Sequence, residues 1–271
     1  MKKLLPTSTA GSLPKPAWLA EPETLWSPWK LQNEELVEGK QDALRLSIED
    51  QQQTGIVIVS DGEQTRQHFV TTFIEHLSGV DFEKRETVRI RNRYDASVPT
   101  VVGAVSRPKP VFVDDAKFLR QQTNKPIKWA LPGPMTMIDT LYDSHYKSRE
   151  KLAWEFAKIL NQEARELEAA GVDIIQFDEP AFNVFFDEVN DWGIATLERA
   201  IEGLNAKRRS TFATATASRP IRTGKRHWDR SGASTNPSSR SCKNRTSISS
   251  RWNATTRMSR WICWNSFAAR R

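Results

Sequence analysis

Hydrophobic runs and amphipathic segments alternate along residues 1–207 of this chain. The predicted strands are residues 4–10, 56–59, 127–131 and 172–177. The run 56–59 is entirely β-branched, which is typical of a strand buried on both faces of a parallel sheet. The predicted helices, with apolar residues at helical spacing, are residues 33–53, 69–77, 114–122, 149–170 and 192–204. This order predicts an α/β fold, either a doubly wound sheet or a barrel.

Residues that favour helix ends mark two of the helices. Asn33 is the predicted N-cap of the first helix, with Glu34 and Glu35 in its first turn. Ser148 is the predicted N-cap of a second, long helix, which Gly171 ends.

Residues 80–112 interrupt the alternation of strands and helices. Apolar and polar side chains alternate along residues 88–90 and 100–105, which flank the polar stretch 91–97. Such alternation is typical of antiparallel strands with one exposed face. We therefore predict a hairpin-like excursion here rather than a further strand of the parallel sheet.

Polar or glycine-rich groups follow each of the four predicted parallel strands. They are Gly11 and Ser12, Asp61 and Glu63, Gly133 and Pro134, and Asp178 and Glu179. Because the carboxyl ends of parallel strands meet at one edge, these groups can converge on one site. A carboxylate just after a strand is often only a cap or a loop charge, so Asp61 alone fits a structural role equally well. Asp178-Glu179-Pro180 is a stronger signal, because the proline restrains the direction of both carboxylates.

Charge and composition change abruptly after residue 207. Residues 208–271 contain 13 Arg and 2 Lys against a single acid, Asp229, for a net charge of +14. Residues 1–207 hold 25 basic and 32 acidic residues, a net charge of −7. The last 64 residues also lack Leu, Val, Glu, Gln and Tyr, so they cannot supply a core of ordinary density. We predict a domain border at residue 207, followed by a disordered basic tail.

Cysteine and histidine usage suggests neither a disulfide framework nor a metal cluster in residues 1–207. Both cysteines, Cys242 and Cys263, lie in the tail. The isolated histidines, His68, His76 and His145, are interpreted as surface or packing residues. No signal-peptide pattern follows Met1, and no run approaches the roughly 18 apolar residues of a membrane span. We therefore expect a cytoplasmic protein that does not act at a membrane.

Several motifs within residues 1–207 resemble, in the same order, the catalytic C-terminal barrel of cobalamin-independent methionine synthase. The matching pieces are Thr9-Ala10-Gly11-Ser12-Leu13-Pro14, Asp61-Gly62-Glu63, Ser106-Arg107-Pro108, Leu131-Pro132-Gly133-Pro134-Met135-Thr136 and residues 168–181. Several motifs in one order form a more specific signal than any one of them. The resemblance implies an incomplete (β/α)₈ TIM-type barrel of the short, single-barrel form. It also implies a methyltransferase of methionine biosynthesis, which transfers a methyl group to the thiol of homocysteine.

The resemblance also implies a substrate site. Ala10, Gly11 and Ser12 would hold the homocysteine carboxylate, largely through backbone donors, and Glu63 and Asp178 would bind its α-ammonium. Two carboxylates facing one ammonium form charge-assisted hydrogen bonds that orient a substrate. The family activates the substrate thiol on zinc. Its ligands are a His-x-Cys pair, a later Glu and a later Cys, all beyond the matching segment, so we expect this chain to bind no zinc and assign no catalytic side chain.

Two positions depart from the family pattern. The folate-stacking tryptophan of the family is Thr140 here, and the folate-contacting glutamate is Val184. A site without those groups can use another methyl donor. The donor, 5-methyltetrahydrofolate or another compound, therefore stays open.

The start of the tail is explained by a change of reading frame. A coding string for His-Ile-Cys-Tyr-Gly-Tyr-Gly, with suitable codons, encodes Thr-Phe-Ala-Thr-Ala-Thr-Ala when it is read one base later. That is the sequence of residues 211–217. A frame change near residues 206–210 would explain the missing ligands, the change in composition and a truncated chain, and it predicts an inactive polypeptide.

Two other interpretations remain. The tail is a basic arm that binds nucleic acid, with arginines for phosphates and Trp228, Trp252, Trp261 and Trp264 for base stacking. Against this, the Arg and Trp residues show no regular spacing. Alternatively, the chain is a related barrel such as a uroporphyrinogen decarboxylase, which should lack Glu63 and Asp178 in these contexts.

Overall fold

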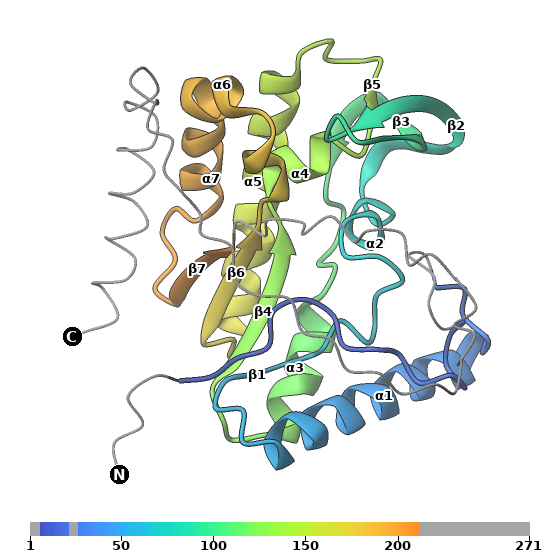
Figure 1. Cartoon of the computed structure of the whole chain (residues 1–271), viewed down its shortest axis with the longest axis vertical. Helices are drawn as coiled ribbons and strands as arrows, with labels where there is room; N and C mark the ends of the chain where they lie inside the picture. The colour runs from blue at the N-terminus through green and yellow to red at the C-terminus, as the bar shows by residue number, and fades with distance from the viewer. Residues whose placement is uncertain (1–5, 22–26, 212–271) are drawn as a thin grey trace, which may run out of the picture. The chain divides into compact units, whose positions relative to one another are not determined.

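A parallel sheet forms the centre of the described chain (Figure 1). The computed structural model describes residues 6–21 and 27–211. The sheet holds, in spatial order, β1 (Val59–Ser60), β4 (Ile127–Pro132), β6 (Ile174–Asp178) and β7 (Lys207–Thr211). Ser8 extends it through a parallel bridge to Ile58.

The order of the strands decides between the two predicted architectures. A doubly wound sheet reverses its strand order at a switch point, whereas in a barrel each strand lies beside its predecessor along the chain. Here the spatial order follows the chain order from Ser8 through β7, apart from the hairpin between β1 and β4. The prediction of an incomplete (β/α)₈ TIM-type barrel is confirmed, and the described strands do not close it.

The two faces of the sheet differ in polarity. Residues paired in register share a face, so Ser60, Lys128, Gln176 and Asp178 lie together on the inner, barrel side. The opposite face is apolar and packs against helices. There Trp129 is fully buried, and its ring lies 5.8 Å from that of Phe112. The barrel interior is therefore polar close to the strand ends.

Helices cover the apolar face. They are α1 (Asn33–Gln53), α3 (Val113–Gln122), α5 (Arg149–Ala169) and α7 (Ile194–Ala200), packed in sequence against one another and the strands. The short helices are α2 (Thr71–Ile74), α4 (Pro134–Ile138), α6 (Phe186–Glu188), the 3₁₀ turn Pro180–Asn183 and the π turn Val189–Gly193. No helix in the described ranges is long and apolar enough to cross a membrane.

The hairpin prediction is confirmed. Strands β2 (Ser78–Ile90) and β3 (Tyr94–Ser106) pair antiparallel, and β5 (Tyr142–Asp143) adds to β3 in parallel. Arg91 and Asn92 form the turn with positive φ angles of 45° and 55°. This small sheet stands apart from the parallel sheet at the upper right of Figure 1.

Several predicted boundaries are corrected. Asn33 does not cap α1: it is the first helical residue, has a φ of 50°, and the helix start shows no side-chain cap. Ser148 does cap α5, accepting a hydrogen bond of 3.3 Å from the Lys151 backbone N–H, and Gly171 follows with a φ of 95°. The helix predicted over residues 69–77 contracts to the four residues of α2, because residues 69–70 and 75–76 form turns on either side of it.

Three further segments differ from their predictions. The strand predicted over 56–59 shifts to Val59–Ser60, and of residues 4–10 only Ser8 bridges to the sheet within the described part. The helix predicted over 192–204 is shorter, because a π turn precedes α7. The border predicted at residue 207 coincides with the first residue of β7, whose backbone continues the sheet to Thr211. The remainder of the predicted tail lies outside the described residues.

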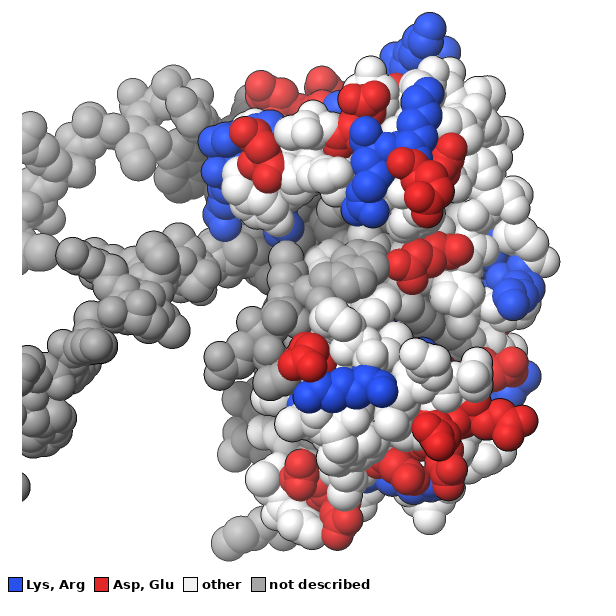
Figure 2. All heavy atoms as spheres, turned by 90° about the vertical axis from the view of Figure 1, so that its right-hand side faces the viewer, with Lys and Arg blue, Asp and Glu red and all other residues white. Residues whose placement is uncertain are grey.

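Surface charges of both signs are interspersed on the face shown in Figure 2. That face of the described chain therefore presents no extended patch of one sign. The mixture agrees with the modest net charge of −7 for residues 1–207.

Candidate functional site

The predicted polar groups follow strands whose carboxyl ends lie along one edge of the sheet. Glu63 follows β1, and Asp178 is the last residue of β6. Glu63 is 8% exposed, and burial raises the pKa of its carboxyl group. Arg66 opposes this shift, Asp61 and Asp178 add to it, and Lys15 opposes it. Glu63 and Asp178 are thus close enough to repel each other.

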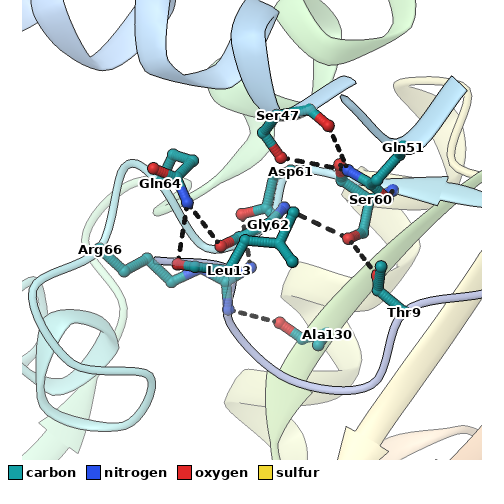
Figure 3. Close-up of polar contacts among 10 residues, drawn as sticks. All are labelled: Thr9, Leu13, Ser47, Gln51, Ser60, Asp61, Gly62, Gln64, Arg66 and Ala130. Atoms are coloured by element: carbon teal, nitrogen blue, oxygen red, sulfur yellow. Dashed lines mark hydrogen bonds and ion pairs between the residues drawn. The ribbon is translucent and has the colours of Figure 1, made fainter. Parts of the chain in front are cut away.

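Asp61 has a structural role. Its carboxylate forms an ion pair of 2.8 Å with Arg66, and both side chains are at most 2% exposed. The Arg66 Nη1 also donates to the Ala130 carbonyl of β4 at 2.8 Å, and the guanidinium lies 4.8 Å and 5.1 Å from the ring centroids of Phe112 and Trp129. The pair therefore joins the turn after β1 to β4 (Figure 3).

The turn that carries Glu63 has a left-handed backbone. Gly62 and Glu63 have φ angles of 62° and 57°, and for a non-glycine residue this conformation costs roughly 1–2 kcal/mol. Gln51 of α1 holds the strand end before the turn, because its amide accepts from the Ser60 N–H and donates to the Ser60 carbonyl, both at 2.9 Å. Burial of this strained turn is consistent with a site that fixes the Glu63 carboxylate.

The segment of residues 10–12 is exposed but is held at its first end. The Thr9 hydroxyl and the Ser60 hydroxyl share a hydrogen bond of 3.0 Å (Figure 3). The Thr9 carbonyl accepts a hydrogen bond from the Lys128 ammonium. Thr9 therefore connects residues 10–12 to both β1 and β4.

The second end of the segment is held by the turn after β1. The Leu13 N–H donates to the Gly62 carbonyl at 3.0 Å, and the Gln64 amide donates to the Leu13 carbonyl at 3.0 Å (Figure 3). Between these anchors, Gly11 has a φ of 80°. The backbone N–H groups of residues 10–12 donate to no other residue of the described ranges, so they are available as donors to a ligand.

The two carboxylates of the Asp-Glu-Pro motif have different roles. Glu179 is fully buried and accepts hydrogen bonds from the N–H groups of Met135 and Thr136 and from the Thr136 hydroxyl, at 2.7 to 2.9 Å. A Cβ at Gly133 would overlap its carboxyl group. Glu179 therefore locks the loop after β4 onto the end of β6, which leaves Asp178 as the carboxylate of this motif at the sheet edge.

Lys128 and Gln176 are bonded to the predicted site residue Asp178 in a chain of hydrogen bonds, but they were not predicted from the sequence. The Lys128 ammonium donates to the Gln176 side-chain oxygen at 2.7 Å, and the Gln176 amide donates to the Asp178 carboxylate at 2.8 Å. The sequence does contain a signal for both residues, since each is a polar residue in an otherwise apolar strand. Gln176 also shares the face of Asp178, two residues later.

His68 agrees with its interpretation as a packing residue. The His68 Nδ1 lies 3.0 Å from the Thr71 hydroxyl at the start of α2. Burial lowers the pKa of His68 to about 4, with smaller contributions from Arg91 and Lys15. His68 is therefore neutral near pH 7.

The Ser-Arg-Pro motif is also structural. Arg107 is buried and forms ion pairs with Glu163 and Glu166 of α5. Glu163 also accepts the Phe112 N–H at 2.7 Å. The motif therefore anchors the chain after the hairpin to α5 and contributes no group to the sheet edge.

The described residues do not provide a metal centre. Within residues 6–21 and 27–211, no group of three or more His, Cys, Asp or Glu side chains could hold a metal ion. Cys242 and Cys263, the two cysteines of the chain, lie outside these ranges.

Comparison with known proteins places these observations in a family. The family described as "Cobalamin-independent synthase, Catalytic domain" matches residues 5–211. A curated methionine synthase of Sulfurisphaera tokodaii is 36% identical over 205 residues, which are 75% of this chain and 60% of that protein. A curated methionine synthase of Sulfolobus acidocaldarius is 33% identical over 205 residues. The chain thus spans about 60% of the length of these relatives.

Two solved structures are also similar. A B12-independent methionine synthase from Shewanella sp. W3-18-1, in complex with selenomethionine, is 84% identical and has a TM-score of 0.75. The match covers 76% of this chain and 60% of that one. A protein from Listeria monocytogenes, 18% identical with a TM-score of 0.53 over 67% of this chain and 56% of that one, shares the fold.

The buried Glu179 predicts a dependence of stability on pH. Burial raises its pKa from 4.5 to about 8, although the donated hydrogen bonds oppose the shift. Between these pH values the folded chain holds a proton that the unfolded chain has lost. The free energy of unfolding should therefore fall as pH rises from about 5 to 8, by up to ~1.4 kcal/mol per pH unit, and then level off.

The measurement is urea unfolding of the wild type and of Glu179→Gln at pH 5, 6, 7 and 8. The substitution removes this proton while it keeps the side-chain volume, so its stability should depend less steeply on pH. Parallel stability curves for the two proteins would show that Glu179 ionises normally in the fold.

Proposed function

Since the chain belongs to the family of cobalamin-independent methionine synthases, as a catalytic domain, we propose that Glu63 and Asp178 bind the α-ammonium of homocysteine or methionine. The reaction proposed for the family site is transfer of a methyl group to the homocysteine thiol. The observation that supports the proposal is the position of both carboxylates at the carboxyl ends of β1 and β6, where Asp178 contributes to the raised pKa of Glu63. An ammonium placed between them would relieve the repulsion and form two charge-assisted hydrogen bonds.

The opposite end of the amino acid has a suitable partner. Ala10, Gly11 and Ser12 form an exposed segment that is anchored through Thr9 and Leu13. Their backbone N–H groups can receive the α-carboxylate, since backbone donors bind anions without adding charge to the site. The selenomethionine in the Shewanella relative is an amino acid with the same two charged ends.

The methyl donor is proposed only by chemical class. Thr140 and Val184 occupy the positions where the family pattern has groups that contact folate. The Thr140 hydroxyl donates to the Met137 carbonyl of α4, which ends two residues before Thr140, at 2.9 Å. We therefore propose 5-methyltetrahydrofolate or another methylated compound, without stacking on residue 140.

The described residues do not include a set of ligands that fits zinc. The resemblance places the zinc ligands beyond the matching segment, and residues 6–21 and 27–211 hold no suitable cluster. A thiol with a pKa near 8.5 stays mostly protonated at neutral pH unless a metal or a base activates it. We propose that this chain binds the amino acid but is not competent for methyl transfer.

We propose that a shifted reading frame begins near residues 206–210. The family match ends at residue 211, close to the change of charge and composition. Residues 1–207 would then form the partial barrel, binding small molecules in the cytoplasm, and residues 208–271 would bind no nucleic acid. Resequencing the locus across the codons for residues 200–215 and translating the neighbouring frame tests this proposal, and a neighbouring frame without the His-x-Cys pair would overturn it.

The amino-acid site is tested by calorimetric titration of the full chain with L-methionine. Glu63→Gln and Asp178→Asn should each weaken binding by about tenfold or more, because each removes one charge-assisted hydrogen bond to the ammonium. Glu38→Gln and Asp50→Asn, on the exposed side of α1, are matched controls that should bind like the wild type. Equal affinity of all five proteins would place the amino acid elsewhere.

The competence of the chain is tested by elemental analysis together with an assay of methionine formation. We expect residues 1–271 to hold no stoichiometric zinc and to form no methionine. A chain with the frame restored after residue 206 should recover both properties together. If the present chain holds one zinc and turns over, the proposal is wrong, and His227, Cys242 and Cys263 become the first ligands to substitute.

A further inference from the structure

We propose that Lys128 is a positioning residue of the amino-acid site, because one buried ammonium group bonds to both halves of that site. One half is the segment of residues 10–12, which begins after Thr9, and the other is Asp178, reached through Gln176. The inference rests on the proposed amino-acid site and adds a residue that touches neither end of the ligand.

Lys128 lies on the inner face of β4 and is 3% exposed. A buried ammonium is costly unless hydrogen-bond acceptors surround it. Lysine has three donors and no acceptor, so the group must be met by oxygen atoms. The Thr9 carbonyl and the Gln176 side-chain oxygen, at 2.7 Å, are two such atoms.

The first arm of Lys128 is its hydrogen bond to the Thr9 carbonyl, which orients the segment that would bind the carboxylate. The peptide between Thr9 and Ala10 is planar and trans, so the Thr9 carbonyl and the Ala10 N–H point in opposite directions. Lys128 holds the carbonyl toward the barrel interior, and the Ser60 hydroxyl holds the Thr9 side chain at 3.0 Å. Fixing this carbonyl therefore also fixes the direction in which the Ala10 N–H can donate.

The second arm of Lys128 is its hydrogen bond to Gln176, which in turn donates to Asp178 and orients that carboxylate. A glutamine amide has an acceptor and a donor end, and the ammonium can bond only to the acceptor. With its oxygen toward Lys128, Gln176 must turn its NH₂ group away, and this group donates to Asp178 Oδ1 at 2.8 Å. Without the lysine, either orientation of the amide becomes possible and the Asp178 carboxylate loses a fixed donor.

The two halves of the site must lie at a fixed distance from each other, because the carboxylate and the ammonium of an α-amino acid are carried by one carbon atom. A small displacement of one half of the site would misplace both contacts. A single ammonium that bonds to both halves sets their separation. Lys128 thus links β4, β6 and the N-terminal segment through the hydrogen bonds of one ammonium group.

The test compares Lys128→Met with Lys125→Met in the full chain. Methionine keeps the length of the stem and removes the ammonium. Lys125 is a matched control, because its ammonium also donates to a backbone carbonyl, that of Ile56 at 2.9 Å, but before β4 begins. Two properties are measured: affinity for L-methionine by calorimetry, and backbone hydrogen exchange across residues 9–13, read at Leu13, whose N–H is protected because it donates to the Gly62 carbonyl.

We expect Lys128→Met to weaken methionine binding by about tenfold or more and to speed exchange at residues 9–13, whereas Lys125→Met changes neither. Lys128→Arg keeps a cation and should recover part of the affinity, which a role of the stem alone does not predict. If Lys128→Met does not fold, Gln176→Met breaks only the second arm, and it should weaken binding without changing exchange at residues 9–13.

Other outcomes would contradict the proposed role of Lys128 or limit it to one arm. Wild-type affinity and exchange in Lys128→Met would overturn the proposal, and so would Lys125→Met behaving like Lys128→Met. If the wild type binds no methionine, the proposed amino-acid site is wrong. Hydrogen exchange alone then tests whether Lys128 holds the N-terminal segment in place. Faster exchange only in Lys128→Met would still support the first arm, and unchanged exchange would overturn it.

Discussion

The buried ion pair between Asp61 and Arg66 is the interaction on which the carboxyl edge of the sheet depends. An arginine that is excluded from water needs a partner for its charge. Arg66 pairs with the Asp61 carboxylate, donates to the Ala130 carbonyl and packs its guanidinium against aromatic rings, although its buried Nε has no hydrogen-bond partner in the described chain. Because these partners come from different segments, the pair fixes the turn after β1 relative to β4, and Glu63 is placed as a consequence.

The two acidic motifs at the edge, Asp61-Gly62-Glu63 and Asp178-Glu179-Pro180, share one feature. In each, one carboxylate serves the scaffold and the other stays at the edge. Asp61 pairs with Arg66 and Glu179 locks the loop after β4, whereas Glu63 and Asp178 remain close enough to repel each other. Spacing within a motif therefore does not show which carboxylate the scaffold uses. The partners of each carboxylate do.

The polar inner face explains how such an edge can be rigid. A sheet buried on both faces normally packs apolar side chains, and a polar group there must be bonded. Lys128, Gln176 and Asp178 satisfy one another in a chain of hydrogen bonds that crosses from β4 to β6. The same bonds that remove the cost of burial restrict how these side chains can point. Stability and orientation therefore have one physical origin in this part of the barrel.

The sequence by itself determined the features that depend on local chemistry: the parallel α/β class, the hairpin of β2 and β3, the Ser148 cap and the strand ends that carry polar groups. It could not show that Asp61 and Glu179 are structural or that the Lys128 ammonium bonds to both Thr9 and Gln176. Those roles depend on partners 5 to 119 residues away in the chain. The tertiary structure alone decides such contacts, because a carboxylate or an ammonium has the same local signature whichever partners the fold brings to it.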